Sequence, residues 1–189
     1  MLFNSVIFIL FFLIVVAVHY LPINWKLKKL HLLLASYFFY AAWNPPFVIL
    51  LWISTCVDWF AARGMNRVRS KLKRKLFLFI SLTANLGMLS WFKYGTLFME
   101  TFASLVEPLG WVWVAPEFNI TLPVGISFYT FQTLSYTIDI FLKRSEPEES
   151  FLDFALFVTF FPQLVAGPIV RPNQLIPQFK SPKRATANQ

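Results

Sequence analysis

The chain has 189 residues, of which 57% are apolar, 19% are aromatic and 14% are charged, and its formal net charge is +8. Soluble domains typically contain about 25% charged residues. The composition therefore excludes both an ordinary soluble domain and a disordered chain, and it indicates a protein whose solvent is the lipid bilayer.

Five long runs without charged residues cover most of the chain: 1–25, 30–57, 76–92, 118–138 and 154–170. About 20 apolar residues make one spanning helix. Four runs therefore predict one crossing each, and residues 30–57 are long enough for two short ones. The sequence predicts an all-α, polytopic transmembrane protein with five or six membrane segments. These form a single domain at 1–180, followed by a polar tail at 181–189.

Prolines interrupt two of these runs. Pro45 and Pro46 remove backbone donors and disfavour helix before them, so they predict a hairpin within residues 30–57. Residues 151–166 contain Pro162 and form a poor lipid-exposed span, because freed backbone groups in hydrocarbon need protein or water partners. We interpret this segment as partly re-entrant, with a full crossing as the alternative.

The N-terminus and the cysteine content set two further limits. Residues 1–5 contain no Lys or Arg and no cleavage pattern follows the apolar run, which favours a retained helix over a secretory signal. Cys56 is the only cysteine, so neither an internal disulfide nor a cysteine-based metal site can form.

Charge predicts the topology. Seven of the 17 basic residues lie in the loop 63–75 beside apolar runs, which is typical of a cytoplasmic loop. Lys26–Lys29 and Lys143–Arg144 then lie on the same side, and the N-terminus lies outside. Residues 94–119 carry three Glu, no basic residue, and Trp111 and Trp113, which favours an external interfacial segment. Anionic lipid suffices as the partner of the positive charge, and nucleic acid is not implied.

Polar residues in the run 118–138 are the first functional candidates. At about 100° per residue, Gln132, Ser135 and Asp139 form one stripe, and the three threonines at 130, 133 and 137 form another. Ser127 precedes them near the start of the segment. Two polar stripes indicate a helix that is surrounded by protein or borders a cavity, with hydrogen bonding to neighbouring helices as the alternative.

Gly167, Pro168 and Arg171 are the second group of candidates. The glycine and the proline interrupt a membrane segment, and the guanidinium just beyond offers a fork of donors suited to carboxylate or phosphate. An interfacial anchor is the alternative role for Arg171.

The remaining ionisable and strongly polar groups predict no site. We interpret His19 and His31 as interfacial, expect Asp58 to stay hydrated or to pair with the basic loop, and expect Asn85 to make an interhelical hydrogen bond. No glycine-rich phosphate loop, zinc ligand set or catalytic triad can be assembled, so neither a metal site nor a catalytic residue is predicted.

Four stretches resemble the N-terminal half of membrane-bound O-acyltransferases: residues 35–43, 91–94, 122–129 with 136–139, and 161–171. They are most similar to the bacterial branch that contains the membrane subunit of alginate O-acetyltransferase. The branch that transfers D-alanine to teichoic acid has a similar glycine-proline motif and is the alternative.

The resemblance implies part of a helical bowl around a tunnel in the bacterial inner membrane. Acetyl-CoA or another acyl thioester would be the donor, with no bound cofactor. A polysaccharide such as alginate would be the acceptor, and periplasmic acetylation proteins would be partners. Ser127, Gln132, Ser135, Gly167, Pro168 and Arg171 are then candidates for substrate binding or for the tunnel.

The resemblance also implies that the catalytic base is an intramembrane histidine far downstream of these motifs. Neither His19 nor His31 matches its position, so we expect a partial enzyme, arising by truncation, frameshift or cloning. A non-enzymatic membrane subunit or a transporter-like protein is the alternative from another functional class. Transport needs ionisable groups at mid-membrane, whereas Asp58 and Asp139 lie near the predicted span ends.

Overall fold

The computed structural model describes residues 4–110, 122–164, 167–168 and 170–181. In these residues it contains helices and no strand, which confirms the all-α prediction. The helices are α1 (Val6–Tyr20), α2 (Trp25–Ala41), α3 (Phe47–Arg67), α4 (Lys71–Val106), the 3₁₀ helix η1 (Glu107–Leu109), α5 (Ile126–Phe141), α6 (Phe151–Thr159), α7 (Phe161–Leu164) and α8 (Pro172–Lys180).

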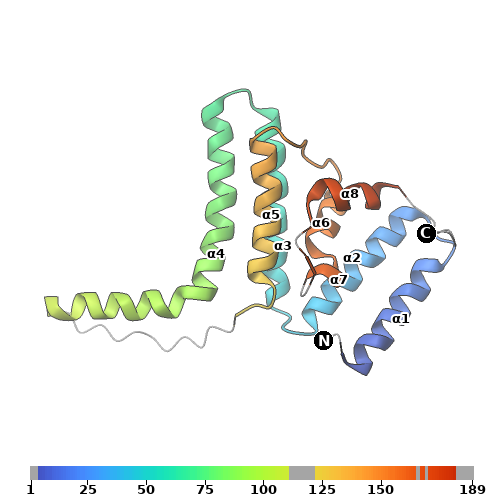
Figure 1. Cartoon of the computed structure of the whole chain (residues 1–189), viewed down its shortest axis with the longest axis horizontal. Coiled ribbons are helices and arrows are strands. Elements are labelled where there is room, and N and C mark those ends of the chain that lie inside the picture. Colours follow the sequence, from blue (N-terminus) through green and yellow to red (C-terminus); the bar gives the residue numbers. More distant parts are fainter. Residues whose placement is uncertain (1–3, 111–121, 165–166, 169, 182–189) are drawn as a thin grey trace.

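The helices form two groups that share one core (Figure 1). In the first group, α3, α5 and the first part of α4 stand side by side and pack against one another. In the second, α2 packs between α1 and α6, and α8 covers α6. Helix α6 also contacts α3 and α5, so it joins the two groups. Fully buried side chains of both, such as Leu51, Tyr136 and Phe157, meet in this core.

Local sequence explains where several helices begin and end. The predicted proline hairpin is confirmed, because α2 ends at Ala41 and α3 begins at Phe47, directly after Pro46. Helix α5 begins only at Ile126, since Gly125 before it has a φ of +76°, in the left-handed region that favours glycine. The segment 151–164 is divided at Phe160 into α6 and α7, and Pro162 lies in the second of them.

Helix α4 differs from its prediction. The sequence suggested a span at 76–92 and a separate interfacial segment after it, but one helix of 36 residues continues to Val106. No helix breaker interrupts 93–106, and its glycine, Gly95, is accommodated at a buried position. Figure 1 shows that the second part of α4 bends away from the other helices and projects sideways. Trp111 and Trp113, like residues 182–189 of the predicted tail, lie outside the described residues.

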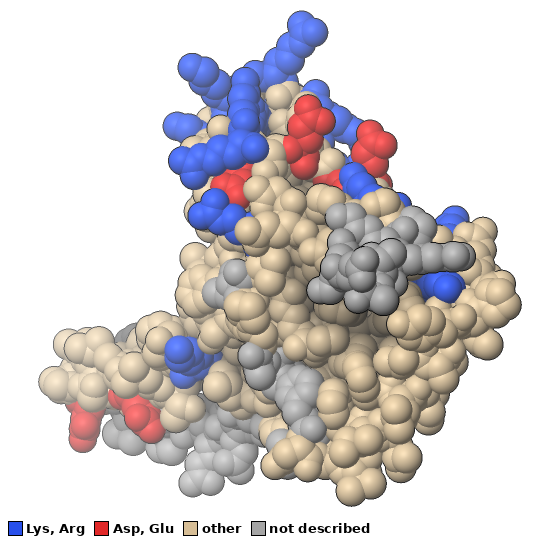
Figure 2. Space-filling model, turned by 45° about the vertical axis from the view of Figure 1, so that its right-hand side comes forward, with Lys and Arg blue, Asp and Glu red and all other residues tan. Residues whose placement is uncertain are grey.

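By length and composition, two helical stretches of the described chain could cross a bilayer, Phe47–Arg67 and Lys71–Leu109. Helix α1 and residues 151–164 are apolar but shorter. Large apolar side chains such as Val6, Phe79 and Phe98 are exposed on the helix surfaces. Figure 2 shows Lys and Arg gathered at one end of the molecule and few charges on the surface below it.

Candidate functional site

The last two family-like stretches meet in space. A Cβ atom on Gly125 would lie 2.7 Å from the carbonyl oxygen of Leu164, so the chain before α5 touches the end of α7 backbone to backbone. The Tyr40 hydroxyl at the end of α2 donates a hydrogen bond to the Val124 carbonyl at 2.9 Å. We call this meeting point of three helix ends the motif junction, comprising residue 40 and residues 122–129, 161–164 and 167–168.

The glycine at position 167 is required by its surroundings. Its N–H donates to the Gln163 carbonyl at 3.0 Å, which folds the chain back on α7. A Cβ atom there would lie 2.6 Å from Gln163 Cα and 2.9 Å from its carbonyl oxygen, closer than real side chains approach. The predicted interruption is therefore a tight turn against the preceding backbone, and Pro168 after it is exposed.

Arg171 lies beyond this turn at the position that precedes α8. Its side chain is exposed, and its guanidinium makes no hydrogen bond or ion pair with any residue that the structure describes. An exposed guanidinium can bind an anion or anchor at an interface, and the predicted role of Arg171 in substrate binding stays a prediction.

Gln132 joins α5 to α6. Its buried Nε2 donates to the Phe157 carbonyl at 2.7 Å. The other amide atom, Oε1, is buried without a hydrogen-bond partner among the described residues, as are Thr130 Oγ1 and Gln163 Nε2. Buried polar atoms are normally paired, so each of these three atoms is available for one further hydrogen bond. Helices α5 and α7 thus carry hydrogen-bonding capacity that the described residues do not use.

The other serine candidates are less constrained. Ser135 is half-buried and its hydroxyl donates to the Gln132 carbonyl one turn earlier, at 2.7 Å. Ser127 is half-buried in the first turn of α5, within the motif junction. Of the six candidates, Ser127, Gly167 and Pro168 belong to the junction, whereas Gln132 and Ser135 lie farther along α5 and Arg171 leads into α8.

A buried polar cluster between α3, α4 and α5 corrects the prediction for Asp58. This carboxylate is fully buried and accepts hydrogen bonds from the Ser81 hydroxyl and from Asn85 Nδ2, at 2.8 and 2.9 Å for the two carboxylate oxygens. It neither stays hydrated nor pairs with the basic loop. Asn85 Oδ1 in turn accepts from Ser54 at 2.6 Å and from Thr133 at 3.4 Å, which confirms the predicted interhelical role of Asn85.

The sequence contains a signal for this cluster. Ser54 and Asp58 are four residues apart on α3, and Ser81 and Asn85 are four residues apart on α4. Polar pairs at that spacing lie on one helix face, and two consecutive helices with such pairs can place them against each other. The prediction for Asp58 relied only on its short distance from the basic loop. It therefore placed the carboxylate at the interface and missed its hydrogen bonds to Ser81 and Asn85.

Charged residues near the basic end connect the two helix groups. Lys29 of α2 forms an ion pair with Asp153 of α6, both nearly buried. Glu148 pairs with Lys180 of α8 at 2.8 Å, and the hydrogen bond from this carboxylate raises the pKa of Lys180 above its usual value. The Trp59 indole donates to the Glu148 carbonyl at 3.1 Å. The acidic linker after α5 is therefore attached to α3 and α8.

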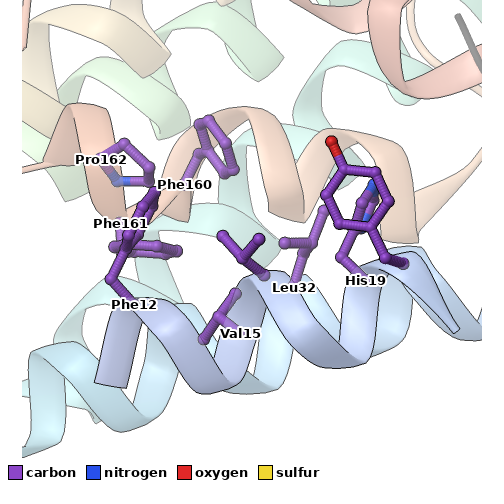
Figure 3. A pocket seen from close by; sticks show the side chains of 9 residues that line it. Phe12, Val15, His19, Leu32, Phe160, Phe161 and Pro162 are labelled. Carbon is purple, nitrogen blue, oxygen red and sulfur yellow. The ribbon is translucent and has the colours of Figure 1, made fainter. Parts of the chain in front are cut away.

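An apolar pocket of about 310 Å³ lies between α1 and the α6–α7 break, as Figure 3 shows. Phe12 and Val15 line it from α1, and Phe161 and Pro162 from α7. His19 lies at one end of the pocket, and its Nδ1 is buried without a partner among the described residues. The size and lining suit part of a lipid or acyl chain. The described residues include no group of three or more His, Cys, Asp or Glu that could hold a metal.

Comparisons with known proteins agree on one kind of relative. Neither a family model nor a solved structure matches the chain. The peptidoglycan O-acetyltransferase of Helicobacter pylori is 34% identical over an alignment 209 residues long, which includes 95% of this chain and 39% of the relative. The probable alginate O-acetylases of Pseudomonas aeruginosa and Azotobacter vinelandii are 34% and 35% identical, over 95% of this chain and 34% and 36% of theirs.

The chain thus spans little more than a third of the length of the curated relatives it matches. The match nevertheless includes nearly all of the chain, and both kinds of relative are O-acetyltransferases. Together with the helical fold and its apolar surface, this similarity confirms the resemblance drawn from the motifs: over nearly all of its length the chain is homologous to O-acetyltransferases of the membrane-bound O-acyltransferase family, and a membrane location fits it.

Proposed function

We propose that the chain forms part of an O-acetyltransferase that modifies a polysaccharide outside the bacterial inner membrane. The observation that carries the proposal is the similarity over 95% of the chain to O-acetyltransferases of two kinds. The identities to the peptidoglycan and alginate relatives are the same, 34%, so they favour neither acceptor. A polysaccharide hydroxyl is the acceptor class that both names share.

The chemistry requires an acyl thioester, such as acetyl-CoA, arriving from the cytoplasm. The acceptor oxygen attacks the carbonyl carbon, the carbon–sulfur bond breaks, and the hydroxyl proton passes by way of a base to the leaving thiol. We assign no base to His19 or His31 and place it in the part of the relatives that this chain does not cover. The residues here shape the site through the turn at Gly167 and the unpaired polar atoms along α5.

We further propose five crossings, by α1, α2, α3, α4 and α5, within one domain at residues 1–180, with 151–164 re-entrant. Charge supports this arrangement, because Lys and Arg gather at one end of the molecule (Figure 2), whereas Glu100 lies in the last part of α4 and Glu107 begins η1 directly after it. The N-terminus is then outside. Helix α1 has 15 residues, about 22 Å, so the bilayer around it has to thin.

A chimera tests the function. The matching part of the Pseudomonas aeruginosa alginate O-acetylase is replaced by this chain in cells that lack the native gene, and acetyl esters on the secreted alginate are measured. We expect acetylation to return, with the periplasmic acetylation partners of that host present. The same exchange in the Helicobacter pylori relative, with acetyl esters measured on peptidoglycan, distinguishes the acceptors.

Arg171→Ala tests the candidate site within a working chimera. If the guanidinium binds an anionic substrate group, acetylation falls about tenfold, the effect of losing one charge-assisted contact. Lys73→Ala removes another exposed basic residue and serves as the control that keeps full activity. A chimera that reaches the membrane at the native level and acetylates neither polymer contradicts the proposed function.

A further inference from the structure

A second cavity, distinct from the motif junction, lies at the basic end of the molecule. It has a volume of about 570 Å³ and is a partly open cavity bordered by the end of α3, the start of α4 and the end of α5. Its polar lining includes Asn66, Arg69, Arg74, Lys143, Arg144 and Glu146. Four cations thus face one carboxylate. We propose that this cavity binds a phosphate group, and the proposal does not depend on the acetyltransferase function.

Arg74 is held in place as part of the cavity wall. Its Nη2 donates to the carbonyls of Ile140 and Phe141 at 3.1 and 2.9 Å, and its guanidinium lies over the Phe141 ring at 5.8 Å from the ring centre. Its Nε is buried and has no hydrogen-bond partner among the described residues. A buried N–H without an acceptor is costly, so an anion in the cavity satisfies a donor that the protein leaves open.

Lys143 is held beside Arg74 in an unusual backbone conformation. Helix α5 ends with two turn hydrogen bonds, from Lys143 N to the Ile140 carbonyl at 3.0 Å and from Arg144 N to the Asp139 carbonyl at 2.8 Å. This helix ending places the residue after the cap in the left-handed region, where glycine is usual. Lys143 has a φ of +60° and is the one non-glycine residue with positive φ in the described part of the chain. Such strain is typical of positions kept for function.

The other charges leave the cavity positive. Arg144 is engaged only loosely by Asp139, at 3.9 Å, and Arg69 is exposed at the rim. Glu146 is the one carboxylate in the lining. Arginine forks and a lysine around a polar cavity suit the oxygens of a phosphate. A preference for positive charge near the cytoplasm explains the exposed Lys71, Lys73 and Lys75, but it does not explain a polar cavity with a strained lysine and a buried, unpaired arginine Nε.

Two sources could supply the phosphate, an anionic phospholipid headgroup and a soluble phosphate ester. Calorimetry of the full chain in neutral detergent at low ionic strength distinguishes them, with short-chain phosphatidylglycerol as one probe and inorganic pyrophosphate as the other. Binding of phosphatidylglycerol alone assigns the headgroup. Binding of pyrophosphate assigns a soluble ester. Binding of neither overturns the proposal.

Matched variants show whether this cavity is the site. We expect Lys143→Gly and Arg69→Gln each to weaken binding about tenfold, and Lys73→Gln, outside the cavity, to change it less than about twofold. Lys143→Gly relieves the strained backbone, so its melting temperature is retained or raised and lost binding cannot be ascribed to misfolding. If Lys73→Gln and Lys143→Gly weaken binding of the phosphate probe equally, the probe is attracted by the overall positive charge of this end of the molecule and is not bound in the cavity. That result overturns the proposal.

Discussion

At the scale of single residues, two glycines differ in whether the structure has room for a side chain at their position. Gly167 faces the backbone of Gln163, whereas Gly87, on an exposed face of α4, has no atom within 4 Å of the position of a Cβ. We expect Gly167→Ala to destabilise the protein by about 1–3 kcal/mol, because backbone cannot yield as a side chain can. Gly87→Ala in the helix interior stabilises it by up to about 1 kcal/mol.

Melting temperatures in detergent, measured by loss of the monodisperse peak on size-exclusion chromatography after heating, check this pair. Equal melting temperatures for the two alanine variants would show that the turn at residue 167 opens easily. The result bears on function too, because the turn positions the chain that leads to Arg171.

Sequence reasoning at this scale succeeded where chemistry is local. The interruption at Gly167–Pro168 and the hydrogen-bonding role of Asn85 follow from the residues themselves. The burial of Asp58 does not, because it depends on α4 presenting Ser81 and Asn85 at the same height as α3. The Lys143 conformation was also missed, since nothing in its neighbours distinguishes it from an ordinary lysine after a helix.

At the scale of helices, hydrogen bonds to Asp58 hold α3 and α4 together. Asp58→Ala removes the acceptor of Ser81 and Asn85, both fully buried, and we expect a loss of about 2–4 kcal/mol in the free energy of unfolding. Thr133→Val removes the long 3.4 Å contact to Asn85 and one bond within its own helix and leaves the Ser81 and Asn85 hydrogen bonds to the carboxylate in place, so its expected loss is below about 1 kcal/mol. Unfolding by denaturing detergent measures both, and similar losses would mean that the cluster does not depend on its carboxylate.

The ion pair between α2 and α6 allows a double-mutant test. Lys29→Met and Asp153→Asn each leave one nearly buried group without its partner, and we expect each to cost about 3 kcal/mol. The double variant should cost less than the two single losses added together, since no unpaired charge then remains. Additive losses would show that the two side chains act independently, contrary to their direct contact.

Helix boundaries were predicted only in part. Prolines marked the end of α2, the start of α3 and the division between α6 and α7, because proline acts on its own backbone. The late start of α5 and the continuation of α4 past Phe92 were missed. Charge and aromatic content suggested a boundary near residue 93, but these features describe the surroundings of a helix and do not stop its hydrogen bonds.

At the scale of the whole molecule, the proposed topology predicts opposite exposure of the two ends of α4. In a variant with Cys56→Ser, a cysteine replacing Arg69 should resist a membrane-impermeant thiol reagent added to intact spheroplasts. A cysteine replacing Leu109, which is exposed, should react at once. Detergent treatment is the control that makes both reactive. Labelling at position 69 in intact cells would reverse the orientation.

The composition was sufficient to predict an all-α protein, and the motifs were sufficient to predict the family that it resembles. The number of crossings could not be read so directly, because α1, α5 and the 151–164 segment are shorter than the apolar runs that contain them. Run length measures hydrophobicity, whereas span length depends on where prolines and glycines let a helix begin.

The contact between Lys29 and Asp153 has a consequence for biosynthesis. The two residues are 124 positions apart in the chain. At a translation rate of about 5–20 residues per second, α2 enters the membrane roughly 6–25 s before its α6 partner has been made. Of the helices that α2 packs against in the described residues, α1 and α3 are made before α6, so this early three-helix state is the one on which insertion factors and membrane proteases act.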